Sequence, residues 1–419
     1  MRQTPQDVLE TTQAVTRHMR SLFEPTPLQL NDFLSTTYGA KIYLKREDLS
    51  PVRSYKIRGA FNAMRKVRDA HPDQNHFVCA SAGNHAQGFA VACRHFGVQG
   101  EIFMPVTTPG QKIDKTRAFG GSSVGIRLTG DYFDQTLAAA QEHCAAKGGH
   151  FLAPFDDPDV IEGQSSVALE ILDALGQAPD MIILPVGGGG LSAGVARYLR
   201  ARGTSTELRF VEPAGGASLT AALAAGTPVS LPAVDTFVDG AAVARMGQHT
   251  FKHLRDVPPA HVLTAPEDRI CATMIEFLNV EGIVLEPAGA LALDILPELR
   301  SQIEGKTVVC VTSGGNFDFE RLPEVKERAM RYAGRKKYFI LRMPQRPGAL
   351  KDFLALLGSS DDIARFEYLK KSARNYGTVL IGIETDDAAK FEALTVAMTN
   401  AGFDHRDITN DEILAEFLI

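Results

Sequence analysis

Residues 181–199 read MIILPVGGGGLSAGVARYL, and this stretch is the most informative one for the fold of the chain. An apolar run, typical of a buried strand, leads into the four glycines of residues 187–190, and a helical pattern follows them. Glycines between a strand and a helix let bare backbone N–H groups, together with the positive end of the helix, reach an anionic group. The stretch therefore predicts a phosphate-binding turn, with a flexible glycine loop as the alternative interpretation.

The residues around the four glycines match neither of the common nucleotide-binding motifs. No lysine of the Walker type follows them. The dinucleotide pattern Gly-x-Gly-x-x-Gly would need a glycine where the chain has Ser192 or Ala193. We therefore expect the phosphate to belong to a ligand other than ATP or NAD.

Short β-rich runs alternate with longer helical patterns through most of the chain. The runs occupy residues 41–44, 76–80, 101–104, 123–128, 181–186, 209–211 and 307–311. This alternation predicts an α/β fold with parallel sheets. Several runs end in glycine, serine or asparagine just before a helix, at residues 81–84, 187–190 and 312–316. Because ligands bind beyond the carboxyl ends of the strands in such sheets, these loops are expected to form one site.

The pattern of predicted strands and helices changes near residue 334. A basic patch at residues 335–337 is followed by the order strand, helix, strand, strand, helix and a short last segment, with a hairpin expected at residues 375–377. This β-α-β-β-α-β order predicts a separate ferredoxin-like module at the C-terminal end.

Composition excludes several classes of protein. The 419 residues are 44% hydrophobic and 22% charged, as in an ordinary globular protein of two or three domains. The net charge is -6 and no basic stripe is present, so nucleic acid is not an expected partner. Five scattered cysteines without a Cys-x-x-Cys pair predict free buried thiols in a reducing compartment. Without a secretory leader or a membrane-length apolar stretch, we expect a soluble cytoplasmic protein with no membrane partner.

Lys56 is the candidate reactive amine. It lies in the segment SYKIRGA of residues 54–60, where a helical pattern begins and Ser54 is a suitable N-cap. The positive helix end and the neighbours Arg53 and Arg58 disfavour an ammonium at this position, which frees the amine for Schiff-base chemistry. A solvated surface charge is the alternative interpretation. Combined with a phosphate turn that lacks nucleotide motifs, the lysine indicates pyridoxal phosphate.

Five motifs together carry a family resemblance. They are SYKIRGA at 54–60, SAGNHAQG at 81–88, PVGGGGL at 185–191, EPAGA at 286–290 and SGGN at 313–316. This set resembles that of the fold-type II pyridoxal phosphate enzymes, in the threonine and serine dehydratase family. The tail, with RPGAL at residues 346–350, resembles the single ACT-like regulatory module that follows the catalytic domain in short-form biosynthetic members.

The resemblance implies a domain organisation. A tryptophan synthase β-like catalytic domain would occupy residues 1–330 as two parallel-sheet subdomains, with the small one, about residues 50–150, inserted in the large one. A ferredoxin-like, ACT-like regulatory domain would occupy residues 335–419.

The resemblance also implies residue roles. Lys56 would bind the aldehyde of pyridoxal 5'-phosphate and later take the Cα proton of the substrate. Asn84 would bond the phenolic oxygen of the cofactor, and Ser313 would face its pyridine nitrogen. The phosphate would be held by Gly187, Gly188, Gly189, Gly190 and Leu191, and the substrate carboxylate by the backbone of Ser81, Ala82, Gly83 and His85.

The activity implied is β-elimination of L-threonine, with L-serine as a secondary substrate, to give 2-oxobutanoate and ammonia as the first step of isoleucine biosynthesis. A hydroxyl at Ser313 cannot keep the pyridine nitrogen protonated, which favours prompt loss of the β-hydroxyl. The alternatives are a serine-preferring dehydratase, a β-replacement lyase and a non-catalytic amino-acid sensor. The resemblance further implies a homotetramer and an isoleucine or valine effector at the ACT-like module.

Several residues keep two interpretations. His85 is either a base or a structural donor, and Glu286 is either a group near the cofactor ring or a charge at a helix start. Racemising relatives have serine where this chain has Ala82, so racemase activity is not expected. Some relatives have a metal-binding carboxylate where this chain has Ser218, six residues after Glu212, so we predict no tightly held divalent metal and no metal ligand among the site residues.

Overall fold

The computed structural model describes residues 4–369, 375–411 and 414. Contacts within the chain separate it into two compact units. The first runs to Glu267 and resumes over Phe277–Phe317, and the second comprises Asp268–Glu276 together with the chain from Asp318 onward. Each unit has a hydrophobic core of its own.

The large sheet of the first unit has six strands in the order β1-β2-β10-β7-β8-β9. All neighbours are parallel except β1, which runs antiparallel to β2. The bounds are β1 Leu28–Leu30, β2 Lys41–Arg46, β7 Met181–Pro185, β8 Glu207–Pro213, β9 Val262–Ala265 and β10 Thr307–Thr312. Every residue of β7 is buried, which is why that strand reads as a continuous apolar run rather than an alternating one.

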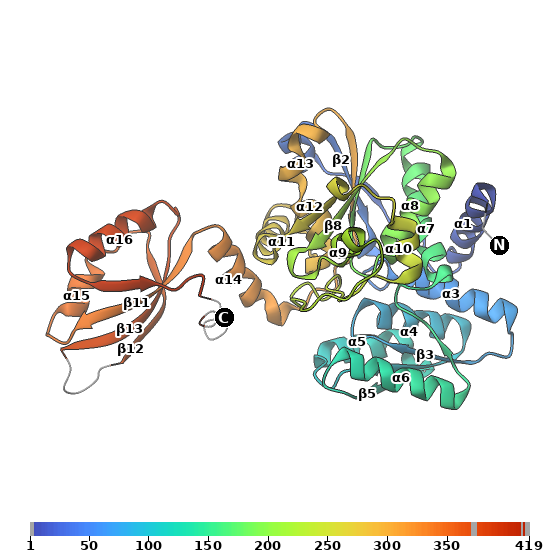
Figure 1. Ribbon diagram of the computed structural model, residues 1–419, viewed down its shortest axis with the longest axis horizontal. Helices are drawn as coiled ribbons and strands as arrows, with labels where there is room; N and C mark the ends of the chain where they lie inside the picture. Colours follow the sequence, from blue (N-terminus) through green and yellow to red (C-terminus); the bar gives the residue numbers. More distant parts are fainter. Residues whose placement is uncertain (1–3, 370–374, 412–413, 415–419) are drawn as a thin grey trace. The chain divides into compact units, whose positions relative to one another are not determined.

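Helices cover both faces of this sheet, with α7 and α8 on one side and α12 and α13 on the other (Figure 1). The helices of this layer arrangement are α1 Pro5–Met19, α2 Asp32–Tyr38, α7 Pro158–Leu175, α8 Gly190–Arg202, α9 Ser218–Ala225, α10 Gln248–Leu254, α12 Pro287–Asp294 and α13 Leu296–Ile303. A further helix, α11 Glu267–Glu281, contributes residues to both units.

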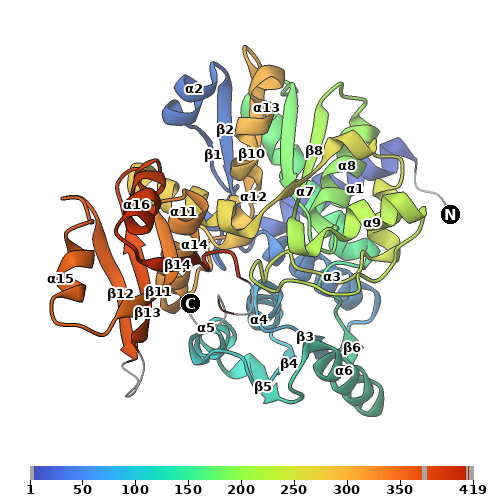
Figure 2. The ribbon, with the colours of Figure 1, turned by 60° about the vertical axis from the view of Figure 1, so that its left-hand side comes forward.

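A second, smaller sheet in the first unit is parallel throughout, in the order β5-β4-β3-β6. Its elements are α3 Lys56–Ala70, β3 His76–Ala80, α4 Asn84–Phe96, β4 Gln99–Met104, α5 Gly110–Gly120, β5 Val124–Leu128, α6 Phe133–Lys147 and β6 His150–Phe151. Side chains alternate between its faces, so Phe77 and Cys79 pack with α4 while Val78 and Ala80 pack with α6. Figure 2 shows β3 and β4 between these two helices.

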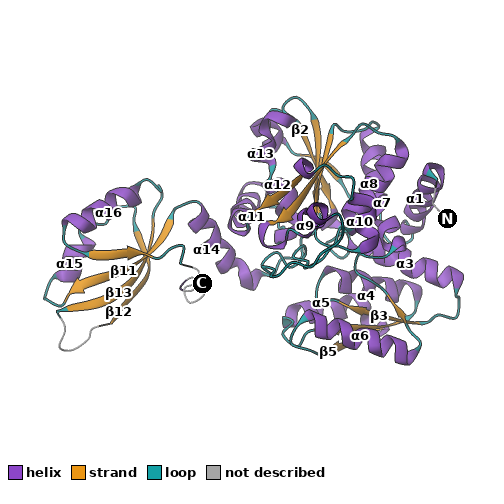
Figure 3. Ribbon diagram, viewed as in Figure 1, coloured by secondary structure: helices purple, strands orange, loops and turns teal. Residues whose placement is uncertain are grey.

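The second unit contains an antiparallel sheet in the order β12-β13-β11-β14, with helices on one face (Figure 3). Its elements are α14 Leu322–Tyr332, β11 Lys336–Pro344, α15 Ala349–Leu354, β12 Asp362–Leu369, β13 Tyr376–Glu384, α16 Lys390–Asn400 and β14 Asp404–Asp407. From β11 to β14 the order is β-α-β-β-α-β, which confirms the predicted ferredoxin-like fold. The predicted hairpin at residues 375–377 is wrong, because Tyr376 and Gly377 belong to β13 and pair with Pro344 and Met343 of β11. The connection between the strands falls largely outside the described residues.

Two expectations from composition can be checked on this fold. All five cysteines are free and buried, as predicted. Among the described residues, no helix has both the length and the apolar character that crossing a membrane requires.

Candidate active site

The turn from β7 to α8 is built so that only glycine fits. Gly189 has φ +86°, a left-handed conformation that side chains disfavour. A Cβ on Gly188 would overlap the ring of Phe155, and one on Gly187 would lie 2.8 Å from the Cα of Ala241. The N–H groups of Gly190 and Leu191 begin α8, where a helix has no acceptors of its own for them. The turn therefore fits the phosphate of pyridoxal phosphate: it offers donors and leaves no room for side chains.

Lys56 lies beside this turn. Its Nζ is half-buried and donates to the carbonyl oxygen of Pro154 at 3.2 Å. The same Nζ is 5.9 Å from the ring centroid of Phe155, the ring that packs on Gly188. Phe155 thus connects the two features that the sequence singled out, and the amine does not point into bulk solvent.

Ser54 and Arg58 do not have the roles beside Lys56 that the sequence predicts. The residue before the helix, Tyr55, is the N-cap, and Ser54 makes no capping bond. Arg58 does not act on the amine, because its fully buried guanidinium binds Glu47, with Nε 2.8 Å from Oε2, and Glu170, with Nη2 2.7 Å from Oε2. Burial alone would lower the pKa of Arg58, but the carboxylates of Glu170 and Glu47 more than offset it and raise the pKa.

This buried ion network fixes the first turn of α3. Glu170 on α7 binds Arg58 and also Lys45 Nζ at 2.6 Å. Burial would raise the pKa of Glu170, but the charges and hydrogen bonds of Arg58 and Lys45 lower it. Tyr55 adds a backbone bond from its N–H to the oxygen of Ser313, at 3.1 Å. The start of the helix that carries Lys56 is therefore tied to both α7 and the end of β10.

Asn84 is the first residue of α4 and lies at the carboxyl end of β3. Its Nδ2 donates to Glu286 Oε1 at 2.7 Å, and its Oδ1 accepts from Asn316 Nδ2 at 2.6 Å. Lys115 in turn donates to Asn316 Oδ1. These bonds orient the amide of Asn84 between the loops that follow β3 and β10.

Glu286 is buried, and its side chain makes no capping bond to α12. Burial and the nearby charge of Asp239 raise the pKa of Glu286 to about 7, against the lowering effects of the Asn84 bond and of Lys112 and Lys115. A Cβ on Gly314 would overlap Glu286 Oε1, so the carboxyl is pressed against the loop after β10. Of the two interpretations of this residue, the structure favours a group facing the site.

The loop of residues 81–85 agrees in part with its predicted role. The N–H of Ser81 already donates to Phe103 at 3.0 Å, and that of Gly83 donates to Ser81 Oγ at 3.2 Å. Both N–H groups therefore already have an acceptor within the protein, and the substrate-binding role of Ser81 and Gly83 stays a prediction. Among the described residues, no such bond is given for the N–H groups of Ala82, Asn84 and His85.

His85 matches the structural interpretation rather than the catalytic one. Its ring is buried, and Nε2 lies 3.1 Å from the oxygen of Leu152. Burial, followed by the charge of Lys56, lowers the pKa of His85 to about 3. A neutral imidazole facing a carbonyl must carry its proton on that nitrogen and donate it.

Ser313 is buried at the carboxyl end of β10, and its Oγ donates to the oxygen of Ala288 at 3.2 Å.

At the position compared with metal-binding relatives, the carboxylate of Glu212 accepts from the backbone N–H groups of Leu219 and Thr220. Ser218 Oγ lies 3.5 Å from the oxygen of Gly187. Glu212 therefore holds the start of α9.

Two neighbouring residues of the site were missed by sequence reasoning. Phe155 packs on the glycine turn, and Asp156 accepts from the N–H groups of His249 and Thr250 at the start of α10. Thr250 Oγ1 then donates to the oxygen of Gly188 at 2.8 Å. These contacts join loops that are distant in sequence, so no local sequence pattern predicts them.

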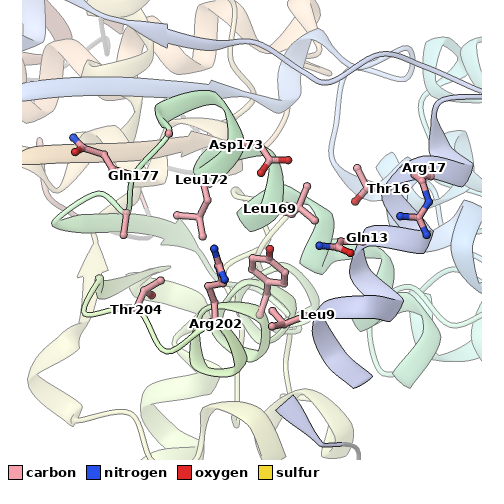
Figure 4. A pocket seen from close by; sticks show the side chains of 13 residues that line it. Leu9, Gln13, Thr16, Arg17, Leu169, Leu172, Asp173, Gln177, Arg202 and Thr204 are labelled. Atoms are coloured by element: carbon pink, nitrogen blue, oxygen red, sulfur yellow. The ribbon is translucent and has the colours of Figure 1, made fainter. Parts of the chain in front are cut away.

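The structure also contains a cavity of about 760 Å³ between α1, α7 and α8 (Figure 4). Leu9 and Gln13 of α1 face Leu169 and Leu172 of α7 across it. None of the residues that line it belongs to the Lys56 site.

Comparisons with known proteins agree with this geometry. Residues 19–314 match the family described as pyridoxal-phosphate dependent enzyme, and residues 327–418 match the C-terminal regulatory domain of threonine dehydratase. The chain is 46% identical to the biosynthetic L-threonine dehydratase IlvA of Bacillus subtilis, over 94% of this chain and 93% of the relative. It is 43% identical to IlvA of Lactococcus lactis, over 96% and 97%.

Among solved structures, the processed form of threonine deaminase isoform 2 from Solanum lycopersicum superposes with a TM-score of 0.72 at 36% identity. The match covers 78% of this chain and 93% of that one. Both the fold class and the cofactor predicted from the motifs are confirmed. The chain therefore belongs to the pyridoxal-phosphate dependent enzymes and, within them, to the family of the biosynthetic L-threonine dehydratases.

Proposed function

We propose that this protein is a dehydratase of L-threonine, as its relatives are named, and that it converts L-threonine to 2-oxobutanoate and ammonia. The observation that carries the proposal is the placement of Lys56 Nζ beside Phe155, the ring that closes over the glycine turn. A half-buried amine next to a turn of free backbone donors suits a small aldehyde that bears a phosphate.

The backbone donors of the turn hold the phosphate in this proposal, from Gly187 to Leu191. Pyridoxal phosphate, when bound, supplies the conjugated ring that makes the Cα proton of an attached amino acid acidic. Lys56 is the group that holds the cofactor and then moves this proton. The oxygen of Pro154 keeps its amine directed at the site, because it accepts from Nζ.

Three further groups orient the reactants. Asn84 would bond the ring oxygen of the cofactor, and its amide is aligned by Glu286 and Asn316. Ser313 would face the ring nitrogen with a hydroxyl whose hydrogen can turn between acceptors. The N–H groups of Ala82 and His85 bind the substrate carboxylate, with the hydroxyl of Ser81 beside them.

Product identification tests the proposal. Purified protein saturated with pyridoxal phosphate is incubated separately with L-threonine, L-serine and O-acetylserine plus sulfide. We expect 2-oxobutanoate and ammonia in equal amounts from threonine, a slower release of pyruvate from serine, and no cysteine. A preference for serine, or cysteine as the main product, would show a serine dehydratase or a β-replacement lyase instead.

A lysine variant links the reaction to the site. Lys56→Ala removes the group that moves the Cα proton, so the rate with threonine should fall by about 10²–10⁴-fold or more. Lys147→Ala is the matched control, since that exposed lysine lies in the last turn of α6. Equal rates for both variants would contradict the assigned role.

For the second part of the chain we propose regulation. Residues 335–419 act as an ACT-like domain that binds an amino acid, isoleucine or valine, and residues 1–330 carry the reaction in a cytoplasmic homotetramer. Support comes from the ferredoxin-like sheet and from its match to the regulatory domain of threonine dehydratase. Isoleucine and valine should change the threonine concentration for half-maximal rate, and light scattering should give four chains. An unchanged rate curve with both amino acids would exclude the effector.

A further inference from the structure

Three potential metal ligands meet on the face of the small sheet that α6 covers. They are His76 at the start of β3, Glu101 in β4 and His143 on α6, and one ligand atom from each lies within 4.8 Å of the others. Within the described part of the chain, this is the one such group of three. We propose that His76, Glu101 and His143 form a binding site for Zn²⁺.

The distances suit a small cation held between the three side chains. His143 Nε2 is 2.7 Å from Glu101 Oε2, and His76 Nε2 is 3.7 Å from Glu101 Oε1. Ligands at the usual zinc distances of about 2.0–2.2 Å in a tetrahedral arrangement stand roughly 3.3–3.6 Å apart. The two separations above, one to each oxygen of Glu101, fall on either side of this range, and all three ligand atoms lie within 4.8 Å of one another.

Two of these atoms are in ion-pair contact but lack a well-directed hydrogen bond. Glu101 Oε2 and His143 Nε2 are both shielded from solvent, yet neither has a hydrogen-bond partner of acceptable geometry in the described residues. Their close approach is therefore not an ordinary hydrogen bond. Because buried polar atoms without a well-directed hydrogen bond are costly, a bound cation would improve the surroundings of both.

The donor set selects the ion. Two imidazole nitrogens and one carboxylate oxygen are a common zinc set, with water completing the coordination, whereas Mg²⁺ and Ca²⁺ prefer oxygen alone. The site lies on the first half of β3 and on β4, while Ser81 and Asn84 follow the carboxyl end of β3. A bound ion would therefore tie α6 to the sheet and leave the reacting groups untouched.

Arg127 is the competitor for this site. Its Nε lies 2.6 Å from Glu101 Oε2, and its side chain is 53% exposed, so the guanidinium is able to swing into solvent. A positive charge this close to the carboxylate weakens the binding of a cation. Removing the guanidinium of Arg127 should therefore strengthen zinc binding at this site. Zinc bound adventitiously elsewhere on the chain would not respond to that change.

The test is a zinc titration of the full chain, saturated with pyridoxal phosphate and first freed of metal, against a competing chromophoric chelator. We expect one Zn²⁺ per chain. Loss of a ligand in His143→Ala, or in Glu101→Gln, which keeps the side-chain shape, should weaken binding at least about tenfold. Arg127→Met should tighten it several-fold.

A matched control is available in the same unit. His261 Nε2 lies 3.5 Å from Glu207 Oε1, and Arg209 Nη1 lies 2.6 Å from the same oxygen, without a second histidine. His261→Ala should leave zinc affinity unchanged. The proposal is overturned if no stoichiometric zinc binds, or if His143→Ala and Glu101→Gln bind it as the wild type does. Threonine turnover by these variants should stay at the wild-type rate.

Discussion

At the scale of single residues, the site depends on side chains whose ionisation is set by burial. Among the described residues, no cation forms an ion pair with Glu286, and its Oε1 accepts from the amide of Asn84. Since burial and Asp239 raise its pKa to about 7, the carboxyl exchanges a proton near neutral pH. A neutral Glu286 costs less to bury than a charged one, so its protonation stabilises the folded chain.

Glu286→Gln tests this assignment through the pH dependence of stability. The folded pKa lies above the unfolded value of 4.5, so the stabilising effect of protonation is complete below pH 4.5 and is lost as pH rises through about 7. From pH 5 to 8, the free energy of unfolding of the wild type should fall relative to that of Glu286→Gln, by at most about 3 kcal/mol. Urea titrations at several pH values measure the difference, and parallel curves would contradict it.

At the scale of elements, the strand–turn–helix of residues 181–202 carries the phosphate site. The fully buried β7 and the N-terminus of α8 were predictable, because both follow from local patterns of apolar residues and glycine. The partner of the turn was not predictable. Phe155 comes from a loop after the small sheet, and only tertiary packing places its ring on Gly188.

Gly188→Ala should disrupt this packing. The added methyl group would overlap the Phe155 ring, and overpacking of this kind costs about 1–3 kcal/mol of unfolding free energy. Cofactor affinity should fall as well, because the same ring adjoins Lys56. Gly125→Ala is the matched control, since a Cβ there meets nothing within 4 Å. Urea midpoints and cofactor titrations of both variants give the comparison, and identical values would argue against a closed turn.

At the scale of the whole molecule, the sequence predicted the fold better than the side-chain contacts within the site. The predicted alternation of strands and helices matches the structure, and so does the predicted β-α-β-β-α-β order at the C-terminal end. Arg58 illustrates the limit: the sequence suggested a charge that acts on Lys56, but Glu47 and Glu170, distant in sequence, neutralise it. His76, Glu101 and His143 likewise come together only when the small sheet forms.

Because the two units have separate cores, calorimetry of the chain should resolve two unfolding transitions. Arg58→Met takes the guanidinium away from the buried carboxylates of Glu47 and Glu170, a loss of about 3–5 kcal/mol that should lower one Tm by roughly 5–10 °C and leave the other unchanged. Arg117→Ala, which breaks the exposed pair with Asp114, is the control and should shift neither. A single transition, or equal shifts in both, would show that the units unfold together.

The most direct measurement asks which lysine holds the cofactor. The protein saturated with pyridoxal phosphate is reduced with borohydride, digested and mapped by mass spectrometry. The account predicts one pyridoxyl phosphate per chain, on the peptide that contains Lys56. A label on another lysine, with Lys56 unmodified, would contradict it.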